Sequence, residues 1–418
     1  MKAIRLLPAI AMLIHAASIS AAALDRSYAI APTGQRACYE TNGAVIACTE
    51  RGASLGGQDA YFAKSSLRYR DGGDGTVADL STGLVWQKAL GPKVTWMQAT
   101  EGAAALHLAG QSDWRLPTIK ELYSLMDFAG SSPAPGRQGK PFIDSTFDFR
   151  YGDTTAGERP IDAQFWSATE YTGRTMGRDA SVFGVNFADG RIKSYPRALP
   201  GRGEHRMFVR YVRGNPGYGR NDFVDNANGT VSDRATGLMW MQVDSGHLKA
   251  GPNGDGRMDW PQALAWAAQI SHGGYSDWRV PNAKELQSIV DYTRSPQTGG
   301  SAAIGSIFKS STIRDEAGGT NFGFYWSSTT HLDGPRAGSA AVYVAFGEAL
   351  GFMRTPLSPS PSLMDVHGAG AQRSDPKQGN PADYPSGMGP QGDVRRIYNL
   401  VRLVRDVSPA KIVAERKP

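Results

Sequence analysis

The chain of 418 residues contains one series of sequence blocks twice, in the same order. The matched blocks are 79–86 with 233–240, 112–122 with 276–286, 165–169 with 325–329, and 209–213 with 401–405. The repeated unit is far longer than the roughly 20–50 residues of a solenoid repeat. We therefore predict two tandem copies of one domain, at 67–213 and 219–406.

The spacing between equivalent residues changes from block to block, which shows that insertions lie between the matched blocks. This marks the blocks as framework and the spacers as surface loops. The unmatched spacers are 131–160, 191–207, 244–257 and 354–394. The last of them is rich in Pro, Ser and Gly, and we predict a long mobile loop there. The spacers are where we expect each copy to carry its own function.

Residues 1–24 have the pattern of an export signal. Lys2 and Arg5 precede an apolar run, and the small residues at 20–23 offer a cleavage site. The run is too short for a membrane anchor, no Cys follows it for lipid attachment, and no other long apolar stretch occurs. We expect an exported protein (periplasmic, cell-surface or secreted) without a membrane span. A leader at 25–66 would precede the two domains, and a tail at 407–418 would follow them.

Cys38 and Cys48 are the only cysteines of the chain. The dipeptide Asn42-Gly43 between them predicts a type I′ hairpin, which would bring the two thiols together. In an oxidising compartment we expect a disulfide that staples this short hairpin. Two free buried thiols are the alternative. Two Cys without a nearby His cannot complete a tetrahedral metal site.

The composition is that of a globular, turn-rich protein. Hydrophobic residues make up 40% and charged residues 20% of the chain, which is enough material for two cores. The 50 Gly and 25 Pro favour loops and turns over long helices. A formal net charge of +6, to which Lys2 and Arg5 contribute, permits affinity for anionic polymers without requiring it. We expect no nucleic-acid partner.

Each copy begins with a turn between short strands and continues with two helices. The expected helix caps are Thr95, Thr118, Asp259 and Asn282, and a capping box is expected at Thr118. The second half of each copy has the pattern of strands, at 181–187, 208–212, 340–346 and 400–404. This order predicts an α+β fold of two loop-rich domains with short, mostly antiparallel strands. The first and last strands of each domain should pair.

The four blocks together resemble a known family. Gly-Leu-x-Trp, Ser-Asp-Trp-Arg-x-Pro-x-x-Lys-Glu-Leu, Trp-Ser-x-Thr and Val-Arg-x-Val-Arg are similar, in this order, to the Lcl C-terminal domain family. The segment of Cys38 and Cys48, with 56–59, resembles the leader often found before this domain. The resemblance implies a C-type-lectin-like fold. It also implies binding of sulfated polysaccharides, as in the best-known member, whose collagen-like Gly-x-y repeat this chain lacks.

Basic residues are concentrated in the first closing strand and in the loop before it, where 191–213 hold seven Lys or Arg and one acidic residue. Guanidinium forks suit sulfate and carboxylate groups of glycans. The candidate ligand-binding residues are Arg197, Arg202, Arg206, Arg210 and Arg402. Side chains alternate along a strand, so one Arg of each closing strand could serve the core while the other meets solvent. A solvated basic loop without a ligand is the alternative.

Acidic turns are weak candidates for a calcium site, which is the one cofactor that the sequence suggests. The residues are Asp71, Asp74, Asp225 and Asn228. They lack the spacing of a helix-loop-helix calcium site, and Asp or Asn before Gly is an ordinary turn former. We favour a structural turn and expect no cofactor.

The matched Trp residues could stack on sugars, but equal apolar positions in two copies are better explained as core. Asp113 with Arg115, and Asp277 with Arg279, are expected to form structural ion pairs or to cap turns. No phosphate loop or His-x-x-x-His motif occurs. The related lectin-like fold includes formylglycine-generating enzymes, which need active-site Cys, whereas both Cys here precede the first domain.

We therefore predict an exported, non-enzymatic protein that binds anionic or cell-surface glycans. A structural or protein-interaction module of the envelope is the first alternative. A hydrolase that uses carboxylates brought together by the fold is the second. The sequence leaves the oligomeric state open.

Overall fold

The computed structural model describes residues 26–199, 201, 203–355 and 358–407, and the predicted export signal lies outside them. Each copy opens with a small antiparallel sheet that its own last strand completes. In copy one the order is β11 (Val212–Arg213), β5 (Val85–Gln87), β4 (Thr76–Asp79) and β3 (Tyr69–Asp71). In copy two it is β22 (Val404–Asp406), β14 (Leu238–Met241), β13 (Thr230–Asp233) and β12 (Phe223–Asp225). The predicted pairing of first and last strands is confirmed.

Two helices follow this sheet in each copy. They are α2 (Trp96–Ala105) and α3 (Ile119–Ser124) in copy one, and α4 (Trp260–Gln269) and α5 (Ala283–Ser288) in copy two. All four predicted caps are present, each in a full capping box with the residue three positions later. A cap satisfies backbone N–H groups that the first helical turn leaves free. Short helical turns also occur at α6 (Pro296–Gly299), η1 (Thr154–Ala156) and η2 (Pro381–Asp383).

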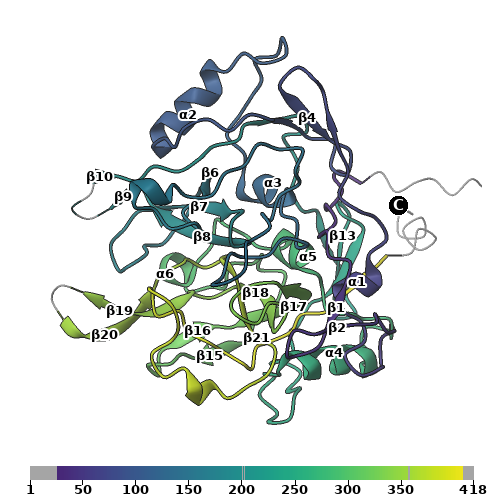
Figure 1. The fold of residues 1–418 in the computed structure, drawn as a ribbon. Helices are drawn as coiled ribbons and strands as arrows, with labels where there is room; N and C mark the ends of the chain where they lie inside the picture. Colours follow the sequence, from purple (N-terminus) through teal and green to yellow (C-terminus); the bar gives the residue numbers. More distant parts are fainter. Residues whose placement is uncertain (1–25, 200, 202, 356–357, 408–418) are drawn as a thin grey trace, which may run out of the picture.

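The two copies share one six-stranded sheet, which the sequence did not predict. Its order is β17 (Phe324–His331), β18 (Ala340–Ala345), β21 (Gln372–Pro376), β8 (Arg191–Pro196), β7 (Ser181–Asn186) and β6 (Gln164–Glu170). Each copy supplies three consecutive strands, and the copies meet where β21 pairs with β8. The largest hydrophobic cluster likewise contains residues of both copies, such as Phe128 and Val290. The copies are therefore one packed body (Figure 1).

The predicted mobile loop at 354–394 is wrong, because this spacer contains regular structure. In copy one β7 turns directly into β8, whereas in copy two an extra hairpin, β19 (Leu350–Thr355) and β20 (Ser358–Asp365), comes between β18 and β21. The Pro- and Ser-rich sequence lies in β20 of this separate two-stranded sheet. Both strands of such a sheet are edge strands, which tolerate a Pro because its missing N–H can face away from the partner strand. Shorter hairpins occur at β9 (Ala198–Leu199) with β10 (Gly203–Glu204), and at β15 (Thr312–Arg314) with β16 (Thr320–Phe322).

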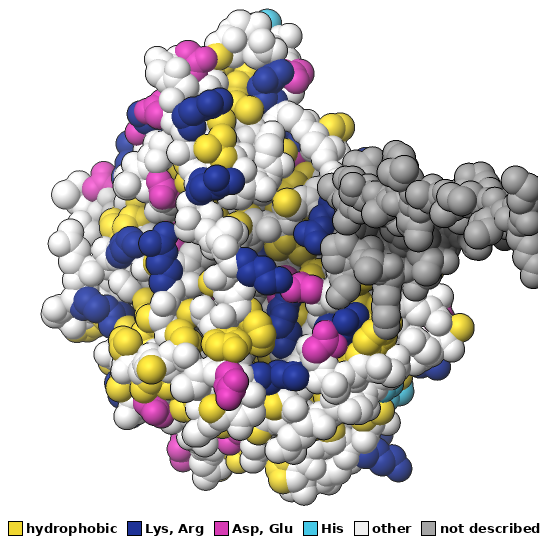
Figure 2. Space-filling model, turned by 90° about the vertical axis from the view of Figure 1, so that its right-hand side faces the viewer, with side chains coloured by type: hydrophobic (Ala, Val, Ile, Leu, Met, Phe, Trp, Pro, Cys, Tyr) yellow, Lys and Arg dark blue, Asp and Glu magenta, His cyan; other side chains and the backbone are white. Residues whose placement is uncertain are grey.

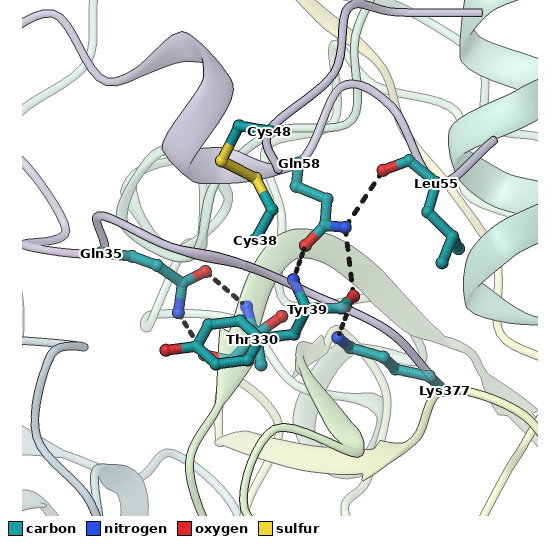
Figure 3. Close-up of a disulfide and its surroundings, with 8 residues drawn as sticks. All are labelled: Gln35, Cys38, Tyr39, Cys48, Leu55, Gln58, Thr330 and Lys377. Carbon is teal, nitrogen blue, oxygen red and sulfur yellow. Dashed lines mark hydrogen bonds between the residues drawn. A yellow bond between two sulfur atoms is a disulfide. The ribbon is translucent and has the colours of Figure 1, made fainter. Parts of the chain in front are cut away.

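The leader crosses the junction of the two copies. It contains β1 (Cys38–Tyr39), β2 (Val45–Ile46) and α1 (Asp59–Phe62). Figure 3 shows the Cys38–Cys48 disulfide beside Gln58, whose side chain bonds both backbone groups of Tyr39. The predicted disulfide and hairpin are confirmed, but the turn is not type I′. That turn needs a positive φ at both central residues, and only Gly43 has one.

Two matched lysines bond across the junction in a reciprocal manner. Lys120 of α3 donates to the Ser288 carbonyl at the end of α5, at 2.6 Å. Lys284 of α5 donates to the Ser124 carbonyl at the end of α3 and to the Pro32 carbonyl of the leader, both at 2.7 Å. Burial lowers the pKa of Lys120 to about 8 and that of Lys284 to about 7. We call this arrangement the lysine clamp.

Candidate functional site

A cleft of about 1240 Å³ lies between the β9–β10 hairpin of copy one and the β19–β20 hairpin of copy two, both at the left of Figure 1. We call it the inter-copy cleft. Copy one lines it with Lys93, 156–159, Asp162, Gln164, Met176, Arg178, Asp179, Lys193, Tyr195, Pro196, Leu199 and 204–206; copy two adds Met353, Arg354, Met364 and Gln391. Three of the four unmatched spacers (131–160, 191–207 and 354–394) thus meet at one site.

The charge of the cleft lining is positive. Its cations are Lys93, Arg159, Arg178, Lys193, Arg206 and Arg354, and its carboxylates are Glu158, Asp162, Asp179 and Glu204. Three cations are neutralised locally, by ion pairs of Lys93 with Glu158, Arg159 with Asp162, and Arg178 with Asp179. Within the described residues, Lys193, Arg206 and Arg354 have no carboxylate partner. Glu204 is the one lining carboxylate outside these three ion pairs, so six cations against four carboxylates leave the lining with a net charge of +2.

Lys193 joins the two sides of the cleft. Its Nζ donates to Gln391 Oε1 of copy two at 2.8 Å and lies 5.0 Å from the centre of the Tyr195 ring. Burial, together with the charge of Arg373, lowers the pKa of Lys193 to about 8. The amine is therefore still mostly protonated at neutral pH. Arg206 and Arg354 are exposed at the rim, and Arg206 makes one long bond, of 3.3 Å, to Gln98.

Of the predicted arginines only Arg206 lines the cleft, and Arg202 lies outside the described residues. Arg197 is near it, but its guanidinium pairs with Glu170 and stacks on the Trp96 ring. Lys193 and Arg354 were missed as individual residues, although both lie in spacers marked as functional. The sequence feature that could have identified them is a basic residue within an unmatched spacer.

Arg210 and Arg402 were wrongly assigned to the ligand-binding surface. Both are fully buried, with exposures of 0% and 1%. Each guanidinium donates to backbone carbonyls of two separate segments of its own copy: those of Gln87, Lys88 and Asp148 for Arg210, and those of Met241, Gln242 and Lys309 for Arg402. They tie the closing strand to the opening sheet, and burial lowers the pKa of Arg210 to about 10.

The matched framework residues are structural in both copies. The six matched Trp residues are all buried, with exposures of 4% or less: Trp86, Trp114, Trp166, Trp240, Trp278 and Trp326. Asp113 does not pair with Arg115, nor Asp277 with Arg279, although all four form structural ion pairs with other residues. Arg115 and Arg279 bond the capping carboxylates Glu121 and Glu285, and Asp113 and Asp277 pair with Arg213 and Arg405 on the closing strands.

Each residue of the acidic turns has one side-chain oxygen that accepts within its own turn, while Asp71 Oδ2 and Asp225 Oδ2 accept from Lys88 and Gln242. Asp71 Oδ1 accepts from Gly73 N, and Asp74 Oδ1 accepts from the backbone and hydroxyl of Thr76. Asp225 and Asn228 accept in the same way from Ala227 and Thr230. In the described part of the chain no cluster of His, Cys, Asp and Glu is arranged to hold a metal ion. These contacts are those of side-chain-capped turns.

A pocket of about 510 Å³ on the leader side bears most directly on the hydrolase alternative. It contains Asp59, Glu285 and Asp406, and burial raises the pKa of Asp59 to about 6. Each carboxylate is occupied, because Asp59 accepts from Thr329, while Glu285 and Asp406 bind Arg279. Figure 2 shows this side, where Lys and Arg are dispersed among acidic and hydrophobic side chains.

Ser311, His247 and Asp244 form a second arrangement that resembles catalytic chemistry. Ser311 Oγ lies 2.8 Å and Asp244 Oδ1 lies 3.0 Å from His247, but both contact the same ring nitrogen, Nδ1. A catalytic triad uses one ring nitrogen for the serine and the other for the carboxylate. Although burial acts to raise the pKa of Asp244, Arg402 and hydrogen bonds lower it to about 2. The cluster therefore fixes the loop at 244–257 and does not form a proton relay.

Comparison with known families agrees with the duplicated architecture. The Lcl C-terminal domain family matches residues 75–213 and 229–358, one match in each copy and more than half of the chain in total. The chain belongs to the Lcl C-terminal domain family. The second match ends at 358, so β21 and β22 lie beyond it, although they are the structural equivalents of β8 and β11. No curated protein and no solved structure matches the chain.

None of the helices in the described ranges is long and apolar enough to cross a membrane. The short helices and several antiparallel sheets are those of an α+β protein.

Proposed function

We propose that this protein is an exported, non-enzymatic binding protein that recognises anionic glycans in the inter-copy cleft. The C-type-lectin-like fold implied by the family resemblance is consistent with this role. The observation that carries the proposal is the meeting of three unmatched spacers around three cations that have no carboxylate partner in the described part of the chain. The matched framework residues account for the folding of both copies. The unmatched spacers are not needed for the shared fold, so we assign them to function.

The chemistry of the cleft suits a sulfated or carboxylated oligosaccharide. Arg206 and Arg354 have no carboxylate partner among the described residues, so their guanidinium groups can form paired hydrogen bonds to sulfate or carboxylate oxygens. Met353 and Met364 offer apolar surface on which the C–H groups of sugar rings can pack. A volume of about 1240 Å³ is above the usual range for a small-molecule site, about 300–1,000 Å³. This size favours a chain of several sugar rings over a single one.

The proposed site needs both copies. Arg206 belongs to copy one and Arg354 to copy two, so we expect one joint site and not two independent sites acting by avidity. The envelope-module alternative requires no glycan ligand, and the hydrolase alternative requires cleavage of the bound chain.

Retention on a heparin column at physiological salt tests the proposal. Replacing both Arg206 and Arg354 by Ala should weaken heparin binding at least about tenfold, because each charge-assisted bond contributes about 1.5–3 kcal/mol. The control is the double variant Arg68→Ala and Arg70→Ala, which loses the same charge from exposed positions in and beside β3. β3 pairs with β4, which lies at the upper right of Figure 1, away from the hairpins that border the cleft. No retention of the wild type, or equal loss in both variants, would overturn the proposal. Release of reducing ends from heparin would favour a hydrolase.

A further inference from the structure

One cation of the inter-copy cleft differs from the other two that have no carboxylate partner among the described residues. Arg206 and Arg354 are exposed at the rim, whereas Lys193 of β8 is only partly exposed. Its Nζ donates to Gln391 Oε1 of copy two at 2.8 Å, so this contact joins the two copies inside the proposed binding site. An ammonium has three donors. Gln391 takes one of them, and the lining position of Lys193 directs the group to the cleft.

The acceptor that holds Lys193 is neutral. An amide oxygen fixes the ammonium without cancelling its charge, which a carboxylate at the same position would do. The two acidic side chains whose charges act on Lys193 each form an ion pair with an arginine: Asp393 with Arg373, and Asp189 with Arg191. The positive charge of Lys193 therefore remains available to an anion in the cleft.

Gln391 is itself held in place by the unmatched spacer of copy two. The next residue, Gly392, accepts from Phe352 N of β19 at 2.8 Å, and a Cβ at this glycine would meet the Phe352 carbonyl. Asp393 then accepts from His367 Nε2 at 2.8 Å. The chain that carries the amide is thus fixed on its C-terminal side. The amide oxygen can therefore position the ammonium that it binds.

The surroundings of Lys193 also set the pH range in which it is charged. Burial, together with the charge of Arg373, lowers its pKa to about 8. Arg159 acts in the same direction, while Asp393 and Asp189 act in the opposite one. The amine is therefore mostly charged at pH 7 and mostly neutral at pH 9.

The other titratable groups that face Lys193 do not change their charge between pH 7 and pH 9. Burial lowers the pKa values of His205 and His367, so both rings are neutral throughout this range. Burial raises the pKa of Tyr195, whose ring centre lies 5.0 Å from the Lys193 Nζ, so this side chain is neutral as well. Guanidinium groups stay protonated.

We propose that Lys193 is the residue that selects anionic ligands in the inter-copy cleft, with Gln391 positioning its ammonium against one sulfate or carboxylate group of the bound glycan. The inference rests on the proposed function, because it concerns the same site. Sulfate and carboxylate groups stay ionised above pH 7. Binding is therefore lost on the protein side as the amine loses its proton.

Surface plasmon resonance of the full chain on immobilised heparin, at pH 7, 8 and 9 and constant physiological salt, tests this inference. Wild-type affinity should fall about tenfold from pH 7 to pH 9, because about one Lys193 amine in ten is still protonated at pH 9. Lys193→Arg stays charged and should lose less than about twofold over this range. Lys193→Met should bind at pH 7 as weakly as the wild type does at pH 9, and should show no further fall.

Two more variants separate this role from general attraction between charges. Gln391→Glu keeps the shape of the side chain but cancels the Lys193 charge, and should weaken binding about tenfold at pH 7. If the contact only joined the two copies, the same change would strengthen it and leave binding intact. Arg354→Gln removes a charge at the rim, so it should weaken binding but keep the fall with pH.

The outcomes distinguish this inference from the proposed function. Absence of heparin binding by the wild type at pH 7 would remove both. Binding that does not fall by pH 9, or that falls equally in Lys193→Arg, would overturn the inference and leave the anionic site standing. Unchanged binding by Gln391→Glu would overturn it as well. Tryptophan fluorescence at each pH checks that every variant is folded.

Discussion

Replacing Lys284 by Met should change the pH dependence of stability more than stability at neutral pH. The Lys284 ammonium is enclosed, with the residue 3% exposed, and it donates to the Pro32 and Ser124 carbonyls. Methionine keeps the length of the side chain but removes its charge and its donors. The variant therefore removes one half of the lysine clamp and leaves Lys120 in place.

The expected magnitude follows from the pKa of Lys284, which burial lowers to about 7, whereas an unfolded lysine titrates near about 10.4. Below pH 7 the amine is protonated in both states, so its burial penalty is fully present and constant. Between these two pKa values the unfolded chain binds more protons, so the free energy of unfolding rises with pH by about 1.4 kcal/mol per unit. From pH 7 to pH 9 this lysine should add about 2 kcal/mol, which Lys284→Met should lack.

Stability at pH 7 alone is a poor test of the clamp. Removing the buried charge should relieve about 4–5 kcal/mol, while two carbonyls left without donors should cost about 2–6 kcal/mol together. These effects oppose one another and are of similar size. The slope with pH isolates the titration of the lysine.

Urea unfolding followed by tryptophan fluorescence at pH 7, 8 and 9 measures this slope. Lys140→Met, at an exposed position, should keep the wild-type slope. Lys120→Met should lose a smaller part, because the pKa of Lys120 is lowered only to about 8. If Lys284→Met and Lys140→Met show the same slope, the clamp does not titrate as described and the reasoning fails.

Two further predictions concern the framework. Arg402→Met should lower the free energy of unfolding by about 3–5 kcal/mol, because it leaves buried carbonyls without a donor. Arg213→Met breaks a partly exposed pair with Asp113 and should lower the free energy of unfolding by less than about 1 kcal/mol. Equal losses for the two variants in thermal or urea unfolding would contradict the assignment of Arg402 to the core. Reduction of the Cys38–Cys48 disulfide, which spans 10 residues, should cost roughly 3 kcal/mol, and denaturation with and without dithiothreitol measures it. An unchanged midpoint would mean that the leader hairpin contributes little to stability.

The features that could be predicted from the sequence are those fixed within a few residues. A helix cap needs only the cap residue and the one three positions later, so Thr118 and Asn282 could be identified directly. The pairing of the closing strand with the opening sheet is a long-range contact, but it could be predicted because the matched blocks place a strand at the start and at the end of each copy. The disulfide followed from the spacing of Cys38 and Cys48 and the turn between them, although the turn type did not.

What the sequence could not show is how the copies use each other. Lys120 and Lys284 occupy the same place in a matched block and looked like framework of one domain, yet each completes the other copy. Arg210 was taken for a surface residue because alternation along a strand says which residues share a face, but not which face is buried. That depends on the sheet packed against the strand. Comparing the two copies of a repeat identifies the residues that each copy needs to fold, but it does not show which residues contact the other copy.

The position of the insertion explains how a duplicated fold acquires an asymmetric function. The equivalent strands β8 and β21 meet at the centre of the shared sheet, so each copy covers an edge that would otherwise be open. This junction leaves little freedom for change, because a shift there would expose edges in both copies. The hairpin β19–β20 enters between β18 and β21 without disturbing their pairing. Met353 on one of its faces lines the inter-copy cleft, and Phe352 on the other face lines a separate cavity of about 270 Å³. A single insertion at a tolerant point therefore gives copy two surfaces that copy one does not have.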